Sequence, residues 1–223
     1  MANKKRMKPK VVFFDCDGVL VISNPWIKLN FAVKIPEAID RSWLKDYYSG
    51  KITFRQWIKR IEKAYLGRGL SFSLFKKLLS RPKINSEVFG ILRYLKKKKI
   101  KTAVISSGID YCVKTIAKKL DLDFWRANYN FIFGKDGKFR RIDYVDTEEK
   151  AKAIQIKEIC RKLKIKPTQT IFVGDSFNDV DAFKLTKHGV MYQSKDKTLK
   201  KVAWKRIKNL SELKNLLETG VKK

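Results

Sequence analysis

Residues 11–19, VVFFDCDGV, carry the strongest structural signal in the chain. The run from Val11 to Phe14 is apolar throughout, which is typical of a parallel strand that is buried on both faces. It ends at Asp15, and a glycine and a second acid, Asp17, follow within three residues. Ligands of parallel sheets bind beyond the carboxyl ends of the strands, so this acidic pair is expected at a binding edge.

The rest of the chain alternates between predicted strands and helices. Short apolar runs predict further buried strands at residues 102–105, 170–173 and 189–192. Apolar positions at helical spacing predict helices at residues 85–95, 113–120, 147–164 and 211–217, with Asn85 and Ser211 as N-caps of the first and the last. The Asp-Gly pair at residues 136–137 predicts a hairpin over residues 130–142. This order of elements predicts an α/β fold, a doubly wound parallel sheet with helices on both faces.

A segment of helices alone interrupts this alternation after the first strand. Helices are predicted at residues 37–48 with Pro36 in the first turn, at residues 53–67 behind a capping box of Thr53 and Gln56, and at residues 73–80. The expected domains are an α/β core, residues 1–22 and 83–223, and a helical lid, residues 23–82. The lid aromatics are expected to pack mainly in the lid itself; they are Trp26, Trp43, Trp57 and Tyr65.

Polar residues follow three of the predicted strands at the point where each strand ends. They are Asp15 and Asp17, then Ser106 and Ser107, and then Asp175, Asn178 and Asp179. Four carboxylates cannot lie close together in ionised form without a cation, and hard oxygen ligands suit Mg²⁺. Gly18 has no Cβ, so the backbone N–H groups of its loop can approach phosphate oxygens. The strand ends therefore predict a site for magnesium and phosphate.

Composition limits the class of protein and raises a second hypothesis. The 223 residues include 52 Lys and Arg against 22 Asp and Glu, a net charge of +30, and 44% are hydrophobic. This is enough apolar material for a core without disulfides. The three cysteines form no CxxC pair and no apolar run is long enough for a membrane span, so a cytoplasmic protein with reduced thiols is expected. The charge attracts polyanions, so nucleic-acid contact through a basic surface is the alternative to a solvated basic face.

Four segments of the chain resemble the motifs of one phosphohydrolase family, the haloacid dehalogenase superfamily. Asp15-Cys16-Asp17-Gly18-Val19 resembles motif I, and Ser106 in the sequence VISSG resembles motif II. Lys152 in EKAK resembles motif III, and GDSFND at residues 174–179 resembles motif IV. The order of the motifs, the lid position and the hairpin are most similar to the phosphoserine phosphatase branch. The resemblance implies a Rossmann-like core with a small cap inserted after the first strand.

The resemblance also implies a mechanism. Asp15 would attack phosphorus and form an aspartyl-phosphate, while Asp17 would act first as general acid and then as general base. Ser106 would donate a hydrogen bond to the phosphoryl group, and Lys152 would balance its charge. Lys150 is the competing lysine, because it lies two positions earlier on the same basic helix.

The motifs further imply which residues hold the metal and the phosphate. Mg²⁺ would be bound by Asp15, by the backbone carbonyl of Asp17 and by Asp175, with Asp179 in a supporting position. The other residues of the phosphate site would be Gly18, Ser107, Gly108 and Asn178.

Two positions depart from the phosphoserine phosphatase pattern. That branch has a Glu nine residues after the nucleophile, which reads the substrate amine, and Asn24 stands there in this chain. Its lid Arg, which reads the substrate carboxylate, is replaced by Ile61, with Arg60 adjacent. A small phosphomonoester is therefore expected as substrate, with phosphoserine as one candidate. A phosphatase of nucleotides or nucleic-acid ends and a non-catalytic phosphate-binding protein are the alternatives, and transfer to an acceptor other than water stays open.

Overall fold

The computed structural model describes residues 8–219, so residues 1–7 and 220–223 of the predicted core lie outside the described residues. Seven strands form one sheet in the order β4-β3-β2-β1-β5-β6-β7. Their bounds are β1 Val11–Phe14, β2 Lys101–Ile109, β3 Phe124–Phe133, β4 Phe139–Tyr144, β5 Thr170–Gly174, β6 Gly189–Tyr192 and β7 Lys205–Ile207. The strand pairs are parallel except for the β3–β4 hairpin, which is antiparallel. The predicted α/β fold class is confirmed.

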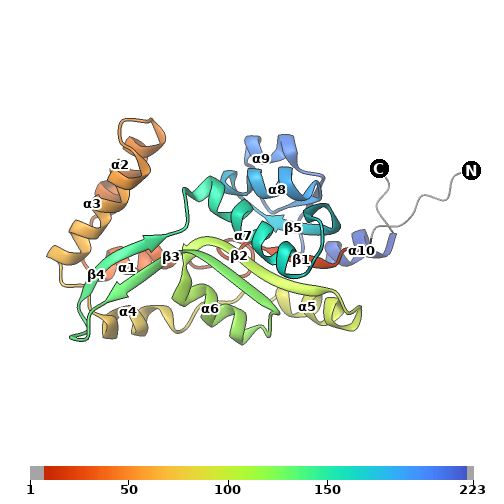
Figure 1. Ribbon diagram of the computed structural model, residues 1–223, viewed down its shortest axis with the longest axis horizontal. Coiled ribbons are helices and arrows are strands. Elements are labelled where there is room, and N and C mark those ends of the chain that lie inside the picture. Colours follow the sequence, from red (N-terminus) through yellow and green to blue (C-terminus); the bar gives the residue numbers. More distant parts are fainter. Residues whose placement is uncertain (1–7, 220–223) are drawn as a thin grey trace, which may run out of the picture.

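Helices cover both faces of this sheet (Figure 1). Their bounds are α1 Pro25–Ala32, α2 Glu37–Tyr48, α3 Phe54–Gly67, α4 Phe72–Leu79, α5 Val88–Lys97, α6 Asp110–Lys119, α7 Glu148–Lys162, α8 Val180–Thr186, α9 Lys197–Val202 and α10 Ser211–Thr219. Side chains alternate between the faces along β1, as expected for a strand. Val12 and Phe14 pack in one layer with α5, α6 and α10, whereas Val11 and Phe13 pack in the other with α7, α8 and α9. Both layers anchor β1 and hold the residues that follow it.

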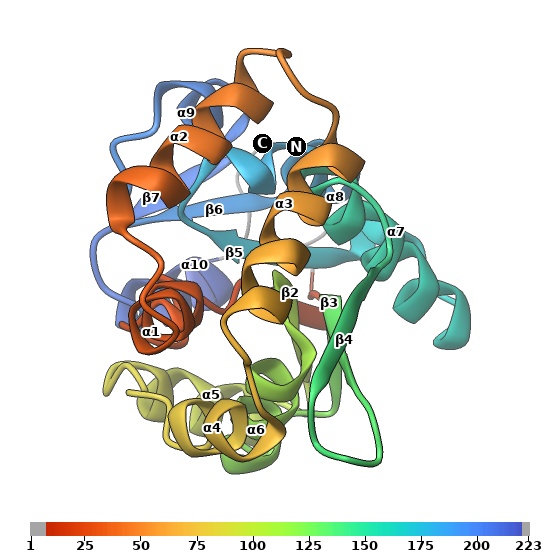
Figure 2. The same cartoon turned by 90° about the vertical axis from the view of Figure 1, so that its left-hand side faces the viewer.

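The helical insertion places α2 and α3 at one end of the sheet, where Figure 2 shows them in front of the strands. The capping box at the start of α3 is present, because Thr53 and Gln56 exchange hydrogen bonds between side chain and backbone. Helix α3 is fastened to the β3–β4 hairpin by Glu62, whose Oε1 accepts the Ile142 N–H at 2.7 Å. The boundaries of the lid at residues 23–82 remain a prediction.

Some element boundaries differ from the prediction for local reasons. The helix expected from Asn85 begins at Val88 instead, although Asn85 Oδ1 accepts the Glu87 N–H at 3.1 Å just before it. The Asn85 amide also donates to the Val19 carbonyl and to the Tyr192 hydroxyl. Ser211 is the first residue of α10 rather than its N-cap, and Pro36 precedes α2 rather than lying in its first turn. No helix of residues 8–219 is long and apolar enough to cross a membrane.

The second predicted strand is longer than expected. It does not end at Ser106 and Ser107 but runs on to Ile109, with a shift in its pairing with β3 between Ser106 and Ile109. Such an irregularity bends a strand and redirects its side chains. Both serines therefore lie within β2 where it leaves regular pairing. The sequence prediction also missed β7, α1, α8, α9 and the first half of β3.

Candidate active site

Three adjacent strands deliver polar groups to one edge of the sheet. Strand β1 pairs with β2 on one side and with β5 on the other, and the Asp15 N–H donates to the Val173 carbonyl at 2.8 Å. A cavity of about 260 Å³ lies at this edge. Of the predicted site residues, it is lined by Asp15, Asp17, Ser106, Ser107, Gly108, Lys152, Asp175 and Asn178. Gly18 and Asp179 do not line the cavity, but both contact residues that do.

Lys152 is the central cation of the site. Its side chain is buried, and its Nζ lies 3.0 Å from Asp15 Oδ1, donates to Asn178 Oδ1 at 2.8 Å and pairs with Asp179. Burial acts to lower the pKa of Lys152, but the Asp15 and Asp179 carboxylates outweigh it and raise the pKa above its ordinary value. Lys150 is exposed on the same helix. The structure therefore brings Lys152, and not Lys150, to the acidic residues.

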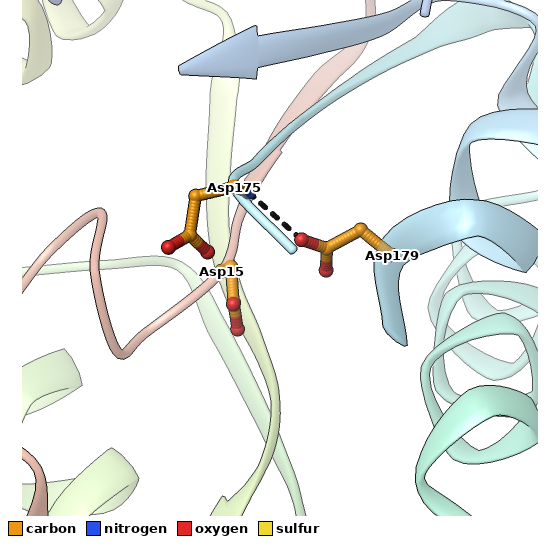
Figure 3. Close-up of side chains that lie close together, drawn as sticks. All are labelled: Asp15, Asp175 and Asp179. Carbon is orange, nitrogen blue, oxygen red and sulfur yellow. Dashed lines mark hydrogen bonds between the residues drawn. The ribbon is translucent and has the colours of Figure 1, made fainter. Parts of the chain in front are cut away.

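Three carboxylates are close enough together to share a cation. One carboxylate oxygen each of Asp15, Asp175 and Asp179 lies within 4.8 Å of the others, and Figure 3 shows the three side chains converging from different elements. Two buried oxygens, Asp17 Oδ1 and Asp175 Oδ1, have no hydrogen-bond partner among the described residues. Burying a carboxylate oxygen without a hydrogen-bond or metal partner costs free energy of folding. This cluster of hard oxygen donors fits a divalent metal ion.

Burial and mutual repulsion raise the pKa values of these acids above their ordinary values. Burial raises the pKa of Asp17 to about 7, against the attraction of Lys152. Burial and the neighbouring Asp179 raise the pKa of Asp175 to about 6. The pKa of Asp15 is also raised, chiefly by burial, with Lys152 opposing. Asp17 can therefore exchange a proton near neutral pH, as a general acid and base must.

Two glycines allow the acidic loops to approach one another. Gly18 has a φ of +84°, and a Cβ at this position would lie 2.1 Å from Asp175 Oδ2. A Cβ on Gly174 would lie 2.3 Å from Asp179 Oδ2, which accepts the N–H groups of Asp175 and Ser176. Asp179 is thus fully engaged by backbone N–H groups and by Lys152. Its place in the structure is that of a residue that positions Asp175 and Lys152.

The serines of β2 face the same cavity. Ser106 Oγ accepts the Gly108 N–H at 2.8 Å, which leaves its own proton free for a ligand. Ser107 Oγ donates to the Glu148 carbonyl at 3.0 Å and so ties β2 to the start of α7.

The lid forms the opposite wall. Asn24 caps α1 by accepting the Trp26 N–H at 2.9 Å, and it lines the cavity together with Ile61. Arg60 does not line it, because its Nη1 is bound to Asp46 at 2.7 Å on the outside of the lid. Both positions that depart from the phosphoserine phosphatase pattern, Asn24 and Ile61, therefore face the cavity. The adjacent Arg60 does not.

Other lining residues were missed by the sequence prediction. Glu148 accepts the Tyr129 hydroxyl at 2.9 Å and the Tyr48 hydroxyl at 3.3 Å, and burial raises its pKa. It precedes Lys152 by one helical turn, which is the signal that could have found it. On the lid, Trp26 and Trp57 line the cavity, as do Asp40, Leu44 and Tyr48 at helical i, i+4, i+8 spacing along α2.

Comparison with known proteins finds the same architecture elsewhere. A family model described as haloacid dehalogenase-like hydrolase matches residues 9–185. The phosphoserine phosphatase of Methanocaldococcus jannaschii is 28% identical over 178 residues, which are 79% of this chain and 82% of that protein. The phosphoserine phosphatase of Archaeoglobus fulgidus is 28% identical over 87% of this chain and 55% of that protein.

Solved structures agree with these sequence relatives. The phospho-aspartyl intermediate analogue of phosphoserine phosphatase is 26% identical with a TM-score of 0.78, covering 96% of this chain and 100% of that chain. A substrate-bound phosphoserine phosphatase complex is also 26% identical, with a TM-score of 0.78 over 93% of this chain and 98% of that chain. The match extends through the lid as well as the sheet.

Proposed function

The chain belongs to the haloacid dehalogenase-like hydrolases, and on that premise we propose that it hydrolyses a small phosphomonoester through an aspartyl-phosphate on Asp15 with Mg²⁺ as cofactor. The protein is a phosphatase of this family and is similar to phosphoserine phosphatases, as its motifs predict. One observation carries the proposal for the reaction. The Asp15 carboxylate lies on the floor of the cavity, held by Lys152 at 3.0 Å, with Asp17 lining the cavity two residues later.

The proposed reaction has two steps. A carboxylate oxygen of Asp15 forms a bond to phosphorus as the bond from phosphorus to the leaving alcohol breaks, and Asp17 gives its proton to the leaving oxygen. Asp17 then accepts a proton from water, whose oxygen bonds to phosphorus and releases phosphate and the free Asp15 carboxylate. Ser106 and the backbone N–H groups of the loop at Gly18 would bind phosphoryl oxygens, and Lys152 would offset their charge.

The acidic cluster would hold the cofactor. Asp15, Asp175 and the backbone carbonyl of Asp17 would be the protein ligands of Mg²⁺, with Asp179 fixing Asp175 through its N–H. When bound, the ion supplies positive charge that stabilises the transferring phosphoryl group. The unpaired side-chain oxygen of Asp175 supports its place in this assignment.

The size and position of the cavity support a small substrate. A volume of about 260 Å³ between strand ends and lid helices suits a small phosphomonoester better than a polymer. The proposed division into a core and a lid at residues 23–82 gives this cavity its two walls. The alternative, a phosphatase of nucleic-acid ends, rests on the net charge of +30.

A substrate panel tests the proposal. Phosphate release is measured from p-nitrophenyl phosphate, small alkyl phosphates, phosphoserine and a 5′-phosphorylated oligonucleotide, each with Mg²⁺ and with EDTA. We expect turnover of small esters that EDTA abolishes. Turnover of the oligonucleotide in preference to every small ester would contradict the small-substrate proposal. Turnover unaffected by EDTA would contradict the metal assignment.

A further inference from the structure

We propose that the leaving alcohol of the substrate carries an ammonium group and no carboxylate, and that Asp40 on the lid recognises this positive charge. The inference rests on the proposed phosphatase and names the substrate class of the same cavity. It follows from the charges, the aromatic side chains and the helix geometry of the lid wall.

The cavity is strongly acidic even though the protein is strongly basic. Five carboxylates line it, namely Asp15, Asp17, Asp40, Glu148 and Asp175. Among the described residues that line the cavity, Lys152 is the only one with a cationic side chain, and it already binds Asp15 and Asp179. At the floor of the cavity, beside Asp15, the positive charge of a divalent ion and the negative charge of a phosphoryl group would compensate one another. Asp40 on the lid then has no cation facing it among the described lining residues, and Glu148 has only Lys152, which Asp15 and Asp179 already bind.

A substrate carboxylate would meet no free cationic side chain among the described residues that line this cavity. Arg60, the lid cation nearest in sequence to the lining residue Ile61, is bound to Asp46 and does not line the cavity. Burying an anion beside Asp40 without a cation would cost binding energy through repulsion and lost hydration. The lid wall therefore selects against the carboxylate that distinguishes phosphoserine from simpler amino-alcohol phosphates.

Helix α2 presents Asp40 to the cavity in a defined way. Asp40, Leu44 and Tyr48 lie on one face of α2 and all line the cavity. Asp40 is half-buried near the Asn30 side chain, which accepts the Tyr65 hydroxyl at 2.7 Å. The carboxylate therefore occupies a defined position on the lid wall. At this position the Asp40 carboxylate can attract an ammonium group of the substrate over a short distance.

Aromatic side chains complete a wall that suits a cation. Trp26, Tyr48 and Trp57 line the cavity, and Trp57 is only 6% exposed. Ammonium groups are attracted to the faces of aromatic rings within about 6 Å, most strongly to tryptophan. The same wall therefore holds one acid and these three rings, with no guanidinium or further ammonium among the described lining residues, which points to a cationic alcohol.

Three substrates that differ by one group each provide the test. They are 2-aminoethyl phosphate, its uncharged isostere propyl phosphate, and phosphoserine, which adds a carboxylate to the first. We expect kcat/KM to be highest for 2-aminoethyl phosphate, by about tenfold over propyl phosphate, with phosphoserine lowest. Equal or faster turnover of phosphoserine than of 2-aminoethyl phosphate would overturn the inference.

Variants of α2 locate the effect. D40N removes the charge with little change of shape and should lower the ratio of kcat/KM for 2-aminoethyl phosphate over propyl phosphate by about tenfold. E37Q removes an exposed carboxylate of the same helix that lies outside the cavity, and its solvent-screened charge near Asp40 should change the ratio by less than about twofold. An unchanged ratio in D40N, or an equal loss in E37Q, would contradict recognition by Asp40.

A binding measurement separates this inference from the proposed chemistry. In the D15N variant with Mg²⁺, calorimetry reports affinity for the same three compounds without turnover. Tighter binding of 2-aminoethyl phosphate than of phosphoserine supports the substrate class even if no phosphate is released by the wild type. Absence of that preference overturns the substrate class, and turnover of propyl phosphate by the wild type would still support the phosphatase.

Discussion

The two walls of the cavity are built in different ways. In the strand-end wall, Asp15, Lys152 and Asp179 are buried and joined to one another and to backbone groups of neighbouring loops. In the lid wall, Asn24 is exposed, Tyr48 is 45% exposed, and the direct bonds to the core near the cavity are long tyrosine contacts such as Tyr48 to Glu148 at 3.3 Å. Rigid, cross-bonded groups suit chemistry, whereas loosely attached elements suit closure and selection. Under the proposed function, this difference assigns the reaction to the strand-end wall and the choice of substrate to the lid wall.

The largest effect is expected from the nucleophile in the strand-end wall. Asp15→Asn should lower phosphate release at least about a hundredfold, because the amide cannot form an acyl-phosphate. Steady-state assays with p-nitrophenyl phosphate measure it. Asp181→Asn changes a half-buried acid on α8 that lies outside the cavity; it is the matched control and should retain wild-type activity. Residual activity close to wild type in Asp15→Asn would assign the nucleophile elsewhere.

Lys152 tests how far the strand-end wall depends on its buried cation. Lys152→Met should lower the free energy of unfolding by about 3–5 kcal/mol, because Asp15 and Asp179 are left buried without a cation. Lys150→Met, at an exposed position of the same helix, should change it by less than about 0.5 kcal/mol. Chemical denaturation compares the two. Similar losses of unfolding free energy in both variants would show that the ion pairs of Lys152 do not stabilise the strand-end wall.

Metal binding should stabilise the strand-end wall by mass action. At a Mg²⁺ concentration about a hundredfold above its dissociation constant, the free energy of unfolding should rise by about 2.7 kcal/mol. Asp175→Ala should abolish this rise and increase the stability of the metal-free protein, since it relieves repulsion among the acids. Thermal unfolding with Mg²⁺ and with EDTA provides the readout. A rise of equal size in Asp175→Ala would exclude Asp175 from the metal site.

Gly18 tests the close packing between the acidic loops. Gly18→Ala places a Cβ only 2.1 Å from Asp175 Oδ2, which is a steric clash, at a position where φ is +84°. Gly137→Ala has a similar φ of +73° but open space around the added Cβ, so it reports the backbone strain alone. Gly18→Ala should cost about 1–3 kcal/mol more in unfolding free energy than Gly137→Ala. Equal costs would show that the loops have room to separate.

The smallest effect is expected where the two walls meet, at Glu148. Burial raises the pKa of this acid above its unfolded value, so the folded state is favoured with Glu148 protonated, and stability is lost as pH rises through the raised pKa. Glu148→Gln stays neutral and should escape this loss. Its stability relative to wild type should therefore grow as pH rises from about 4 to about 8 in thermal unfolding. A constant difference across this range would contradict burial of the charge.

The strand-end wall could be predicted from sequence because its positions are set by strand geometry. Asp15, Ser106 and Asp175 each lie at or near the end of an apolar run, and the carboxyl ends of neighbouring parallel strands meet at one edge. Lys152 has no such signal of its own, since the helix carries several lysines, and only the motif distinguished it from Lys150. The length of β2 was missed because its continuation beyond Ser106 depends on irregular pairing with β3.

The lid wall was less predictable. Its helices follow from signals such as the capping box at Thr53, but the face that each turns to the cavity depends on packing between elements. Arg60 and Ile61 are neighbours in sequence, yet successive residues point about 100° apart on a helix, and only Ile61 lines the cavity. Asp40 carries no motif, so its place in the cavity emerged only with the structure.

Direct detection of the acyl-phosphate tests the central claim. Asp17→Asn should slow hydrolysis of the intermediate, so a rapid acid quench of this variant with p-nitrophenyl phosphate and Mg²⁺ should trap it. Borohydride reduction followed by peptide mass spectrometry should then show Asp15 converted to homoserine. The same conversion should be absent with EDTA. The proposed intermediate would be contradicted if the wild type releases phosphate while the quenched Asp17→Asn variant shows no modification at Asp15. Modification at another acid instead of Asp15 would contradict it as well.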